Sequence, residues 1–373
     1  MSVFTTLRRS IALAACTLPA LLPAQVASKL DVSGLIFGAF SYRTNAGAQN
    51  TNKFDLERVY LNFRLPVADR LSIRVTPDIS AQVAGTGYVV RMKYAYLQYD
   101  RPAQPGGYSG FVRAGALQTA TLEHVESFWP RWMGSAHLEK YGYFSSADVG
   151  VSGQLTFPKK QGELYAAITN GSGYANPETD RFKSYAARLT LTPLMAGSHG
   201  LWSTFAISPW IDLNRSASKF VSGGAGQVGA VGEGLTKNRI GLWVGIKDPR
   251  LVIGANYSQR IDGNESGANT AASPRSVTDV TGRLLSGFTI FRPFQLADSA
   301  SKSPLSVLVR YDAVKPNVDA SPADHLFQAS LIFDLTRSRK AQVAFDFQEV
   351  LGDVPAATIA PDKRLQVRLM TTF

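Results

Sequence analysis

The feature of this sequence that most constrains its fold is a two-residue period of apolar side chains, repeated in segment after segment from residue 30 to residue 373. Residues 70–76 read RLSIRVT, so Leu71, Ile73 and Val75 lie on one face of an extended chain and polar side chains on the other. An amphipathic helix would instead place apolar residues at i, i+3 and i+4, and these segments do not. The period therefore predicts β-strands with two chemically different faces.

Sixteen segments share this period, and their connections alternate in length. Short connections, such as 66–69 and 158–162, come between long ones, such as 120–146 and 213–235. Short turns at one end and long loops at the other are typical of an outer-membrane barrel. We predict an all-β, antiparallel, up-and-down transmembrane barrel of about sixteen strands, with short periplasmic turns and long extracellular loops. The predicted strands lie near 30–43, 53–65, 70–81, 88–100, 109–119, 147–157, 163–170, 182–193, 201–212, 236–247, 251–261, 277–291, 304–314, 324–336, 340–350 and 362–373.

The N-terminus resembles an export signal. Arg8 and Arg9 precede an apolar stretch at 10–22, and small residues follow, which predicts a signal peptide over 1–24 with cleavage after Ala24 or Ala27. Residues 13–16 read LAAC, which also resembles a lipoprotein cleavage box, but the apolar stretch continues beyond it and favours ordinary cleavage. The rest, 28–373, is then a single barrel without cysteine.

Two soluble all-β folds compete with the barrel: a propeller, and a secreted or periplasmic β-sandwich that binds a ligand. A propeller blade would need strands of about half this length. Aromatic residues near strand ends instead predict girdles at two membrane interfaces. The last strand ends on Phe373, which predicts the signal that a barrel assembly machinery recognises. The girdle candidates are Phe40, Tyr42, Tyr94, Tyr96, Phe157, Trp210, Phe291 and Phe373.

Several segments between residues 30 and 195 resemble the phosphate-selective porin O and P family. They include LERVYLNFRL at 56–65, KYAYLQY at 93–99, VRAGALQ at 112–118, ADVGVSGQL at 147–155 and YAAITNGSGY at 165–174. The resemblance implies a sixteen-stranded, homotrimeric, water-filled channel for small anions. The sequence departs from that family in its third loop, which mixes acids with bases and puts phosphate specificity in doubt.

The predicted strand phases give a basic lumen, in keeping with a formal net charge of +11. If apolar residues face lipid, fourteen bases and only Asp148, Glu163, Asp279, Asp312, Asp334 and Asp346 face the pore. A basic ring concentrates anions and repels cations, so we predict anion selectivity. Arg113 and Arg188 could equally hold an inward-folded loop in place. The predicted lumen bases are Arg58, Arg64, Arg70, Arg74, Arg91, Lys93, Arg113, Arg188, Lys237, Arg239, Arg283, Arg310, Arg364 and Arg368.

The third loop, about residues 120–146, is long enough to be functional. We predict that it folds into the lumen and narrows it, with Glu123, His124, Glu126, Arg131, Glu139 and Lys140 as its charged or titratable residues. A metal site made from its two histidines and a glutamate is disfavoured, because thirteen positions separate the histidines. The loop also carries six aromatic residues: Phe128, Trp129, Trp132, Tyr141, Tyr143 and Phe144.

Nothing in the sequence indicates catalysis or a cofactor. There is no Gly-x-Ser-x-Gly motif and no glycine-rich loop within a βαβ unit, and the four histidines are scattered. Runs of Lys and Arg that would indicate nucleic acid are absent. The predicted function is a passive outer-membrane channel for small hydrophilic solutes with a preference for anions, including phosphate. Its predicted partners are those solutes, outer-membrane lipid and lipopolysaccharide. A channel for long-chain lipids would need an apolar lumen.

Overall fold

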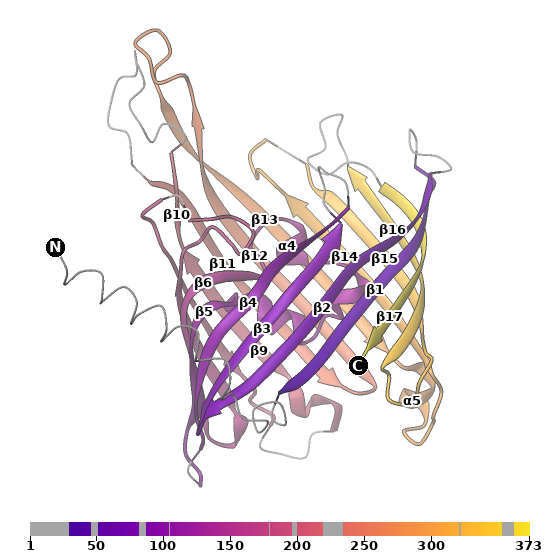
Figure 1. Ribbon diagram of the computed structural model, residues 1–373. Coiled ribbons are helices and arrows are strands. Elements are labelled where there is room, and N and C mark those ends of the chain that lie inside the picture. Colours follow the sequence, from indigo (N-terminus) through magenta and orange to yellow (C-terminus); the bar gives the residue numbers. More distant parts are fainter. Residues whose placement is uncertain are drawn as a thin grey trace, which may run out of the picture.

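The chain forms one antiparallel sheet that closes on itself (Figure 1). The computed structural model describes residues 30–45, 51–81, 87–103, 105–178, 180–195, 200–218, 234–320, 322–352 and 362–373. β1 closes the barrel against β17, from Leu35 opposite Thr372 to Arg43 opposite Arg364. β9 and β10 both pair with β11 and flank Asn214, so they are two parts of one wall strand. The predicted closed barrel of sixteen strands is confirmed, whereas the predicted signal peptide lies outside the described residues.

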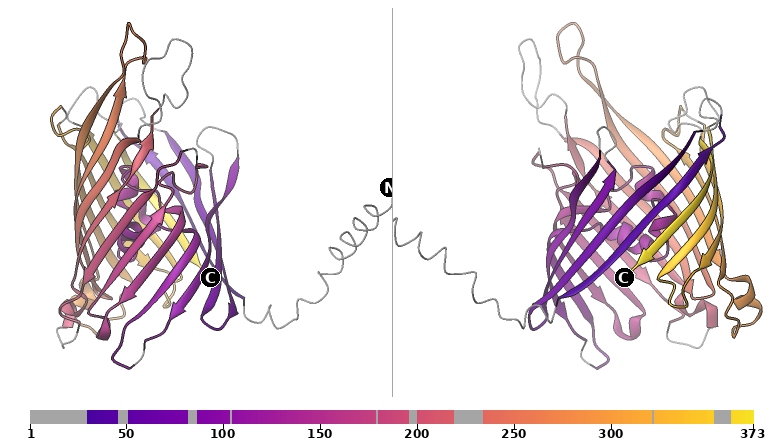
Figure 2. Two further views of the ribbon diagram at one scale, coloured as in Figure 1. Left: turned by 90° about the vertical axis from the view of Figure 1, so that its left-hand side faces the viewer. Right: turned by 45° about the vertical axis from the view of Figure 1, so that its right-hand side comes forward.

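The observed strands follow the predicted ones closely. The largest departures are at β9, which begins five residues later than predicted, and at β12, which ends five residues later than predicted. β12 and β13 form a hairpin that extends well beyond the neighbouring strands (Figure 2). In the described part of the chain, no helix is long and apolar enough to cross a membrane. The strands are β1 (Asp31–Arg43), β2 (Asn52–Ala68), β3 (Leu71–Ala81), β4 (Tyr88–Arg101), β5 (Ser109–Gln118), β6 (Ala147–Thr156), β7 (Gly162–Thr169), β8 (Ser184–Leu191), β9 (Ala206–Leu213), β10 (Arg215–Ala217), β11 (Gly234–Asp248), β12 (Leu251–Ser266), β13 (Ser276–Phe291), β14 (Leu305–Lys315), β15 (Asp324–Asp334), β16 (Ala341–Gly352) and β17 (Asp362–Thr372).

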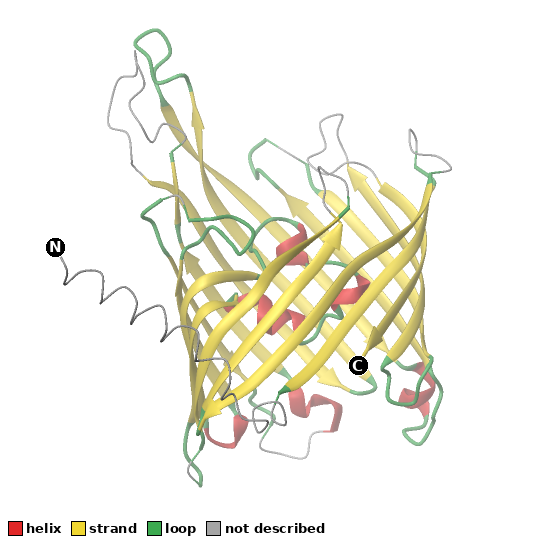
Figure 3. Cartoon of the chain, viewed as in Figure 1, coloured by secondary structure: helices red, strands yellow, loops and turns green. Residues whose placement is uncertain are grey.

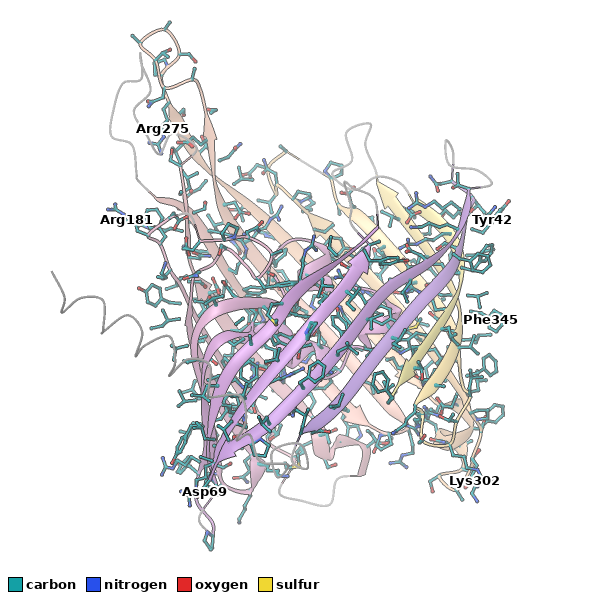
Figure 4. All side chains as sticks on the ribbon, viewed as in Figure 1. Tyr42, Asp69, Arg181, Arg275, Lys302 and Phe345 are labelled. Atoms are coloured by element: carbon teal, nitrogen blue, oxygen red, sulfur yellow. The ribbon has the colours of Figure 1, made fainter. Side chains whose placement is uncertain are left out.

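The two ends of the barrel differ, as predicted, but less sharply. Asp69 and Lys302 lie at the short-turn end, and Tyr42 and Arg275 lie toward the loop end (Figure 4). Two connections at the turn end are longer than a tight turn: residues 192–205 contain η4 (Gly200–Thr204), and residues 292–304 contain α5 (Pro293–Ala297). η3 (Pro158–Lys160) occupies a third connection at this end.

The two termini of the barrel meet at the turn end. The backbone N–H of Gly34 donates to the carbonyl of Phe373 at 3.1 Å, and the Phe373 N–H donates back at 3.3 Å. The phenyl ring of Phe373 lies where a side chain on Gly34 would have to go. The last residue thus belongs to the seam that closes the sheet, so the strand has no free apolar edge.

The outer wall is apolar and exposed. Leu285, Phe345 and Leu369 each have more than half of their surface accessible, and Phe345 projects away from the wall in Figure 4. An apolar surface that encircles the sheet suits lipid and disfavours the soluble alternatives. Among the predicted girdle residues, Phe40 is on this outer face, with its ring 4.8 Å from that of Phe54.

Part of the girdle prediction is wrong. Tyr94, Tyr96 and Trp210 are each at most 6% exposed and face the barrel interior. Their strands carry a second set of apolar side chains on the inner face, which the simple phase rule assigned to lipid. Trp210 packs on Phe144 of the third loop, at 5.3 Å between ring centres. Tyr94 and Tyr96 cluster instead with Leu117 and Ala147, and a register shift between β3 and β4 next to Tyr94 turns both tyrosines inward.

Candidate functional site: the third loop inside the barrel

The third connection, residues 119–146, lies inside the barrel at mid-height. It contains α3 (Ala120–Glu126), η2 (Arg131–Met133) and α4 (His137–Lys140), which the strands surround (Figures 2 and 3). Leu122, Met133 and Leu138 have no exposed surface. A segment this deeply packed is part of the folded interior and narrows whatever passage the barrel has.

An apolar seat on the inner wall holds the loop. Trp243 of β11 and Phe288 of β13 point inward, and the rings of Phe128 and Trp129 pack on them at 5.4 and 4.9 Å. Buried aromatic pairs of this kind contribute both area and geometry. Leu284, Leu308 and Ile332 extend the seat along β13, β14 and β15.

The sequence does carry a signal for this seat. Strands that are buried on both faces read as continuous apolar runs rather than as alternation. Residues 284–285 are Leu-Leu and residues 305–309 read LSVLV, so their inward leucines interrupt the polar phase. The seat could therefore have been placed on β13 and β14 from the sequence.

Wall side chains anchor the loop through its backbone carbonyls. Arg310 donates to the carbonyl of Ser135 at 2.9 Å, and Arg368 donates to the carbonyl of Trp132 at 3.1 Å. Gln328 donates to the carbonyl of Met133 at 3.1 Å. Arg188 donates to the carbonyl of Ala120 and pairs with Glu163. The carbonyls of Trp132, Met133 and Ser135, which lie outside α3 and α4, thus gain hydrogen-bond donors from the wall.

The anchoring arginines are also paired with buried carboxylates. Arg310 is 2.7 Å from Asp312, and Arg368 is 3.1 Å from both Asp346 and Glu57. Both guanidinium groups are almost fully buried. Removing one member of such a pair would leave the other charge buried alone, which is costly.

The loop carboxylates are paired as well. Glu123 is 3.0 Å from Arg113 of β5. Arg131 is 2.9 Å from Glu126 and also binds Glu139, with one contact at 3.0 Å. Lys140 is exposed to the interior at the end of α4, and no carboxylate of the described residues lies within ion-pair distance of it.

The two loop histidines serve packing. His124 Nε2 is 3.0 Å from the hydroxyl of Ser208, and burial together with Arg188 and Lys247 lowers the pKa of His124. The His137 ring stacks on Trp243 at 5.7 Å, and burial lowers the pKa of His137 to about 3. Within the described ranges, no three metal-ligating side chains gather at one point.

A different arrangement covers the inner wall of β2, β3 and β4. Arg74 donates to Asn62 at 2.8 Å and lies 4.6 Å from the centre of the Tyr94 ring. Lys93 lies over the Tyr60 ring at 4.5 Å. Together with Arg64 and Arg91 they form what we call the free arc: four inward cations with no carboxylate of the described chain within 4 Å. The other cation here, Arg58, pairs with Asp78 at 2.8 Å.

The remaining predicted lumen residues divide into correct and incorrect assignments. Lys237, Arg239 and Arg364 face inward, and Arg239 pairs with Asp262 at 2.6 Å. Arg283 and Asp279 were predicted to face inward, but they share the outward phase of the exposed Leu285, because the buried Leu284 faces the interior. Arg70 is in the turn between β2 and β3.

The prediction also missed inward charges. Glu57 points inward because a β-bulge sits there, opposite Phe37 and Gly38. Asp78 and Asp212 are in phase with the inward residues of their own strands and were overlooked, and Arg260 and Asp262 face inward from β12. The interior is therefore nearer to charge balance than the predicted fourteen bases against six acids.

The loop divides the interior. At the turn end a cavity of about 590 Å³ lies beside α3, lined by Glu123, His124, Arg188 and Lys247 among others. Toward the loop end a polar cavity of about 350 Å³ is lined by residues of β1, β2 and β17, including Arg43, Asp55 and Arg364. Both are large enough for small hydrated solutes.

Comparisons with known proteins agree on the architecture. No family model matches the sequence, and no curated protein does. Among solved structures, the chain is similar to OmpT of Vibrio cholerae, with 12% identity and a TM-score of 0.57 over 92% of this chain and 99% of that one. The fold is that of a porin barrel. It is also similar to the outer membrane channel DcaP of Acinetobacter baumannii (12% identity, TM-score 0.59, 92% and 97% covered) and to an anion-selective porin from Comamonas acidovorans (10% identity, TM-score 0.56, 92% and 99% covered).

Proposed function

We propose that this protein is a passive diffusion channel of the bacterial outer membrane for small hydrophilic solutes, with a moderate preference for anions. The observation that carries the proposal is the third loop, which lies inside a porin barrel between two polar cavities. A channel of this kind needs no catalytic residue and no cofactor. Its mechanism is diffusion down a gradient through a constriction with a fixed charge pattern.

The free arc supports the preference for anions. Most inward arginines are neutralised by a neighbouring carboxylate, so they add little to the potential along the passage. Arg64, Arg74 and Arg91 keep their charge on one side of the interior, whereas Lys93 is almost fully buried behind the Tyr60 ring. Because low-dielectric walls focus the field of such charges, the arc attracts anions.

We further propose that phosphate is among the anions that the channel admits. The resemblance of residues 30–195 to the phosphate-selective porin O and P family supports it, and that region contains the whole free arc. A guanidinium can donate two hydrogen bonds to a phosphate oxygen pair, which suits Arg74 and Arg91. The paired glutamates of the third loop favour a general anion channel that admits phosphate over a dedicated phosphate channel.

A planar bilayer experiment tests both parts. Under a potassium chloride gradient, the reversal potential of single channels should indicate chloride preference, and replacing chloride with phosphate should preserve the current. Cation preference would refute the selectivity proposal. A barrel that conducts no ions would refute the channel itself.

We also propose that the channel assembles as a homotrimer. One of the similar structures, OmpT of Vibrio cholerae, is a trimer form, and the exposed apolar wall offers surface for contact between copies. Native mass spectrometry in mild detergent should detect three copies. A monomer under conditions that preserve other porin trimers would contradict this.

A further inference from the structure

Two exposed cations face outward on neighbouring strands. Arg283 of β13 and Lys315 of β14 are directly opposite each other in the sheet register, and both are exposed. Directly opposed like charges on one face of a sheet are destabilising. No carboxylate of the described residues lies within ion-pair distance of either one. The nearest outward acid along β13, Asp279, accepts a hydrogen bond from Thr236 at 3.4 Å.

Along the membrane normal, Arg283 and Lys315 lie at the level of the lipid headgroups. On β14 the outward positions run from Leu305 at the turn end to Lys315 at the loop end. Ten steps of ~3.3 Å along a strand tilted by ~40° span roughly 25 Å across the membrane, the height of the apolar band of such barrels. Lys315 and Arg283 therefore stand at the outer, loop-side edge of the band.

The outward residues next to Arg283 and Lys315, on the side of the membrane centre, are typical of a membrane–water interface. Leu285 and Tyr311 follow on the two strands, one and two outward positions closer to the membrane centre, and both are about half exposed. Tyr257 of β12 is opposite Leu285, and Gln259 of β12 is opposite Arg283. Tyrosine rings at headgroup level below a polar tip are typical of membrane interfaces. An amide, a guanidinium and an ammonium are thus side by side above an apolar surface.

From this arrangement we propose that Arg283, Lys315 and Gln259 bind a phosphate group on the headgroup of an outer-leaflet lipid. The phosphate lies between the opposed cations and removes their repulsion. Arg283 and Gln259 supply directed hydrogen bonds, and Lys315 supplies charge. The acyl chains of the same lipid cover Leu285 and Tyr311.

Another outward cation of the rim shows the contrast. Lys363 of β17 faces outward near the loop end, but its ammonium is 3.1 Å from Glu349 and 5.8 Å from the centre of the Phe347 ring. Lys363 has its counter-charge within the protein and needs none from lipid. It is the matched control for the proposed site.

The test uses the folded barrel in lipid nanodiscs and measures the temperature at which its heat-modifiable gel band shifts. Discs containing bis-phosphorylated lipid A should raise this temperature above discs of zwitterionic lipid alone. In the double variant Arg283→Gln/Lys315→Gln the rise should shrink by half or more, and in Lys363→Gln it should persist. In lipid-free detergent the double variant should be no less stable than the unmodified protein, because it removes a repulsion.

Three outcomes would overturn the proposal. The first is an undiminished rise in the double variant. The second is an equal rise when inorganic phosphate replaces lipid A, which would assign the site to free phosphate. The third is an equal loss in Lys363→Gln, which would reduce the effect to general surface charge. The site lies on the outer wall, so none of these results depends on whether the barrel conducts.

Discussion

The inner walls of β2–β4 and of β14–β17 carry the same residue types in the same inward phase, yet they differ in what their cations do. Arg310 and Arg368 are buried, paired with acids and bonded to loop carbonyls. Arg74 lies over the Tyr94 ring and keeps its charge, because no carboxylate of the described residues is within ion-pair distance of it. Under the proposed function, an inward arginine contributes to anion preference only where no acid lies beside it.

The local sequence shows part of this difference. Arg310 has Asp312 two positions along its strand, hence on the same face, whereas Arg74 has Thr76 there. Asp78, the next inward residue of β3, is taken by Arg58 from β2. An acid two positions along the same strand thus predicts that an arginine is neutralised. Whether an acid is instead paired with an arginine of a neighbouring strand cannot be read from the local sequence.

The largest effect should come from removing an arginine of β14–β17 that binds the third loop. Arg368→Met leaves Asp346 and Glu57 without their partner and frees the Trp132 carbonyl, so we expect unfolding to become easier by about 3–5 kcal/mol. The gel-shift temperature should fall and single-channel conductance should rise and fluctuate as the loop loosens. Arg64→Met, an exposed inward position of the free arc, is the control and should leave the temperature unchanged. Equal gel-shift temperatures for Arg368→Met and Arg64→Met would contradict the distinction between paired and unpaired inward arginines.

The second effect is a pH dependence of the anchored loop. The pKa of His137 is about 3 in the folded protein and ~6.5 when unfolded, so the unfolded chain binds the extra proton first as pH falls. The stability that this neutral histidine contributes is complete above pH ~6.5 and is lost toward pH 3, by about 2 kcal/mol between pH 7 and pH 5.

The measurement compares the gel-shift temperature of the unmodified protein with that of His137→Gln at several pH values between 7 and 5. The unmodified protein should lose more stability on acidification than the variant, because glutamine does not titrate. Parallel curves would show that His137 is not held neutral by its burial against Trp243.

The third effect concerns the free arc alone. Neutralising Arg74 and Arg91, which are partly exposed to the interior, to Gln should lower the preference for chloride over potassium by about two- to fivefold, since an exposed charge contributes roughly 0.2–1 kcal/mol. Stability should change little. The preference of the unmodified channel should also weaken with salt, because the Debye length falls from ~10 Å at 0.1 M to ~3 Å at 1 M. The outer-wall variant Arg283→Gln/Lys315→Gln is the control and should leave the preference intact.

The smallest effect should come from the loop acids. Glu126→Gln with Glu139→Gln removes the two carboxylates that pair with Arg131, which should raise chloride preference by less than about twofold, because all three side chains are mostly shielded from the passage. Reversal potentials measure this as well. A shift toward cations would mean that Arg131 loses its position once its partners are gone.

The sequence by itself determined the closed sixteen-stranded barrel and most of its strand limits, because a strand in lipid must alternate lipid-facing and interior residues along its whole length. It also determined the inward phase of most lumen charges, including Arg74, Arg113 and Arg368. The tertiary structure decided which of those charges remain free. Pairings such as Arg368 with Glu57 join residues from opposite ends of the chain and depend on a bulge, and the apolar seat on β11–β15 exists only because the loop folds onto it. Alternation is a local property of each strand, whereas the neutralisation of a charge depends on which distant residue lies within about 4 Å of it.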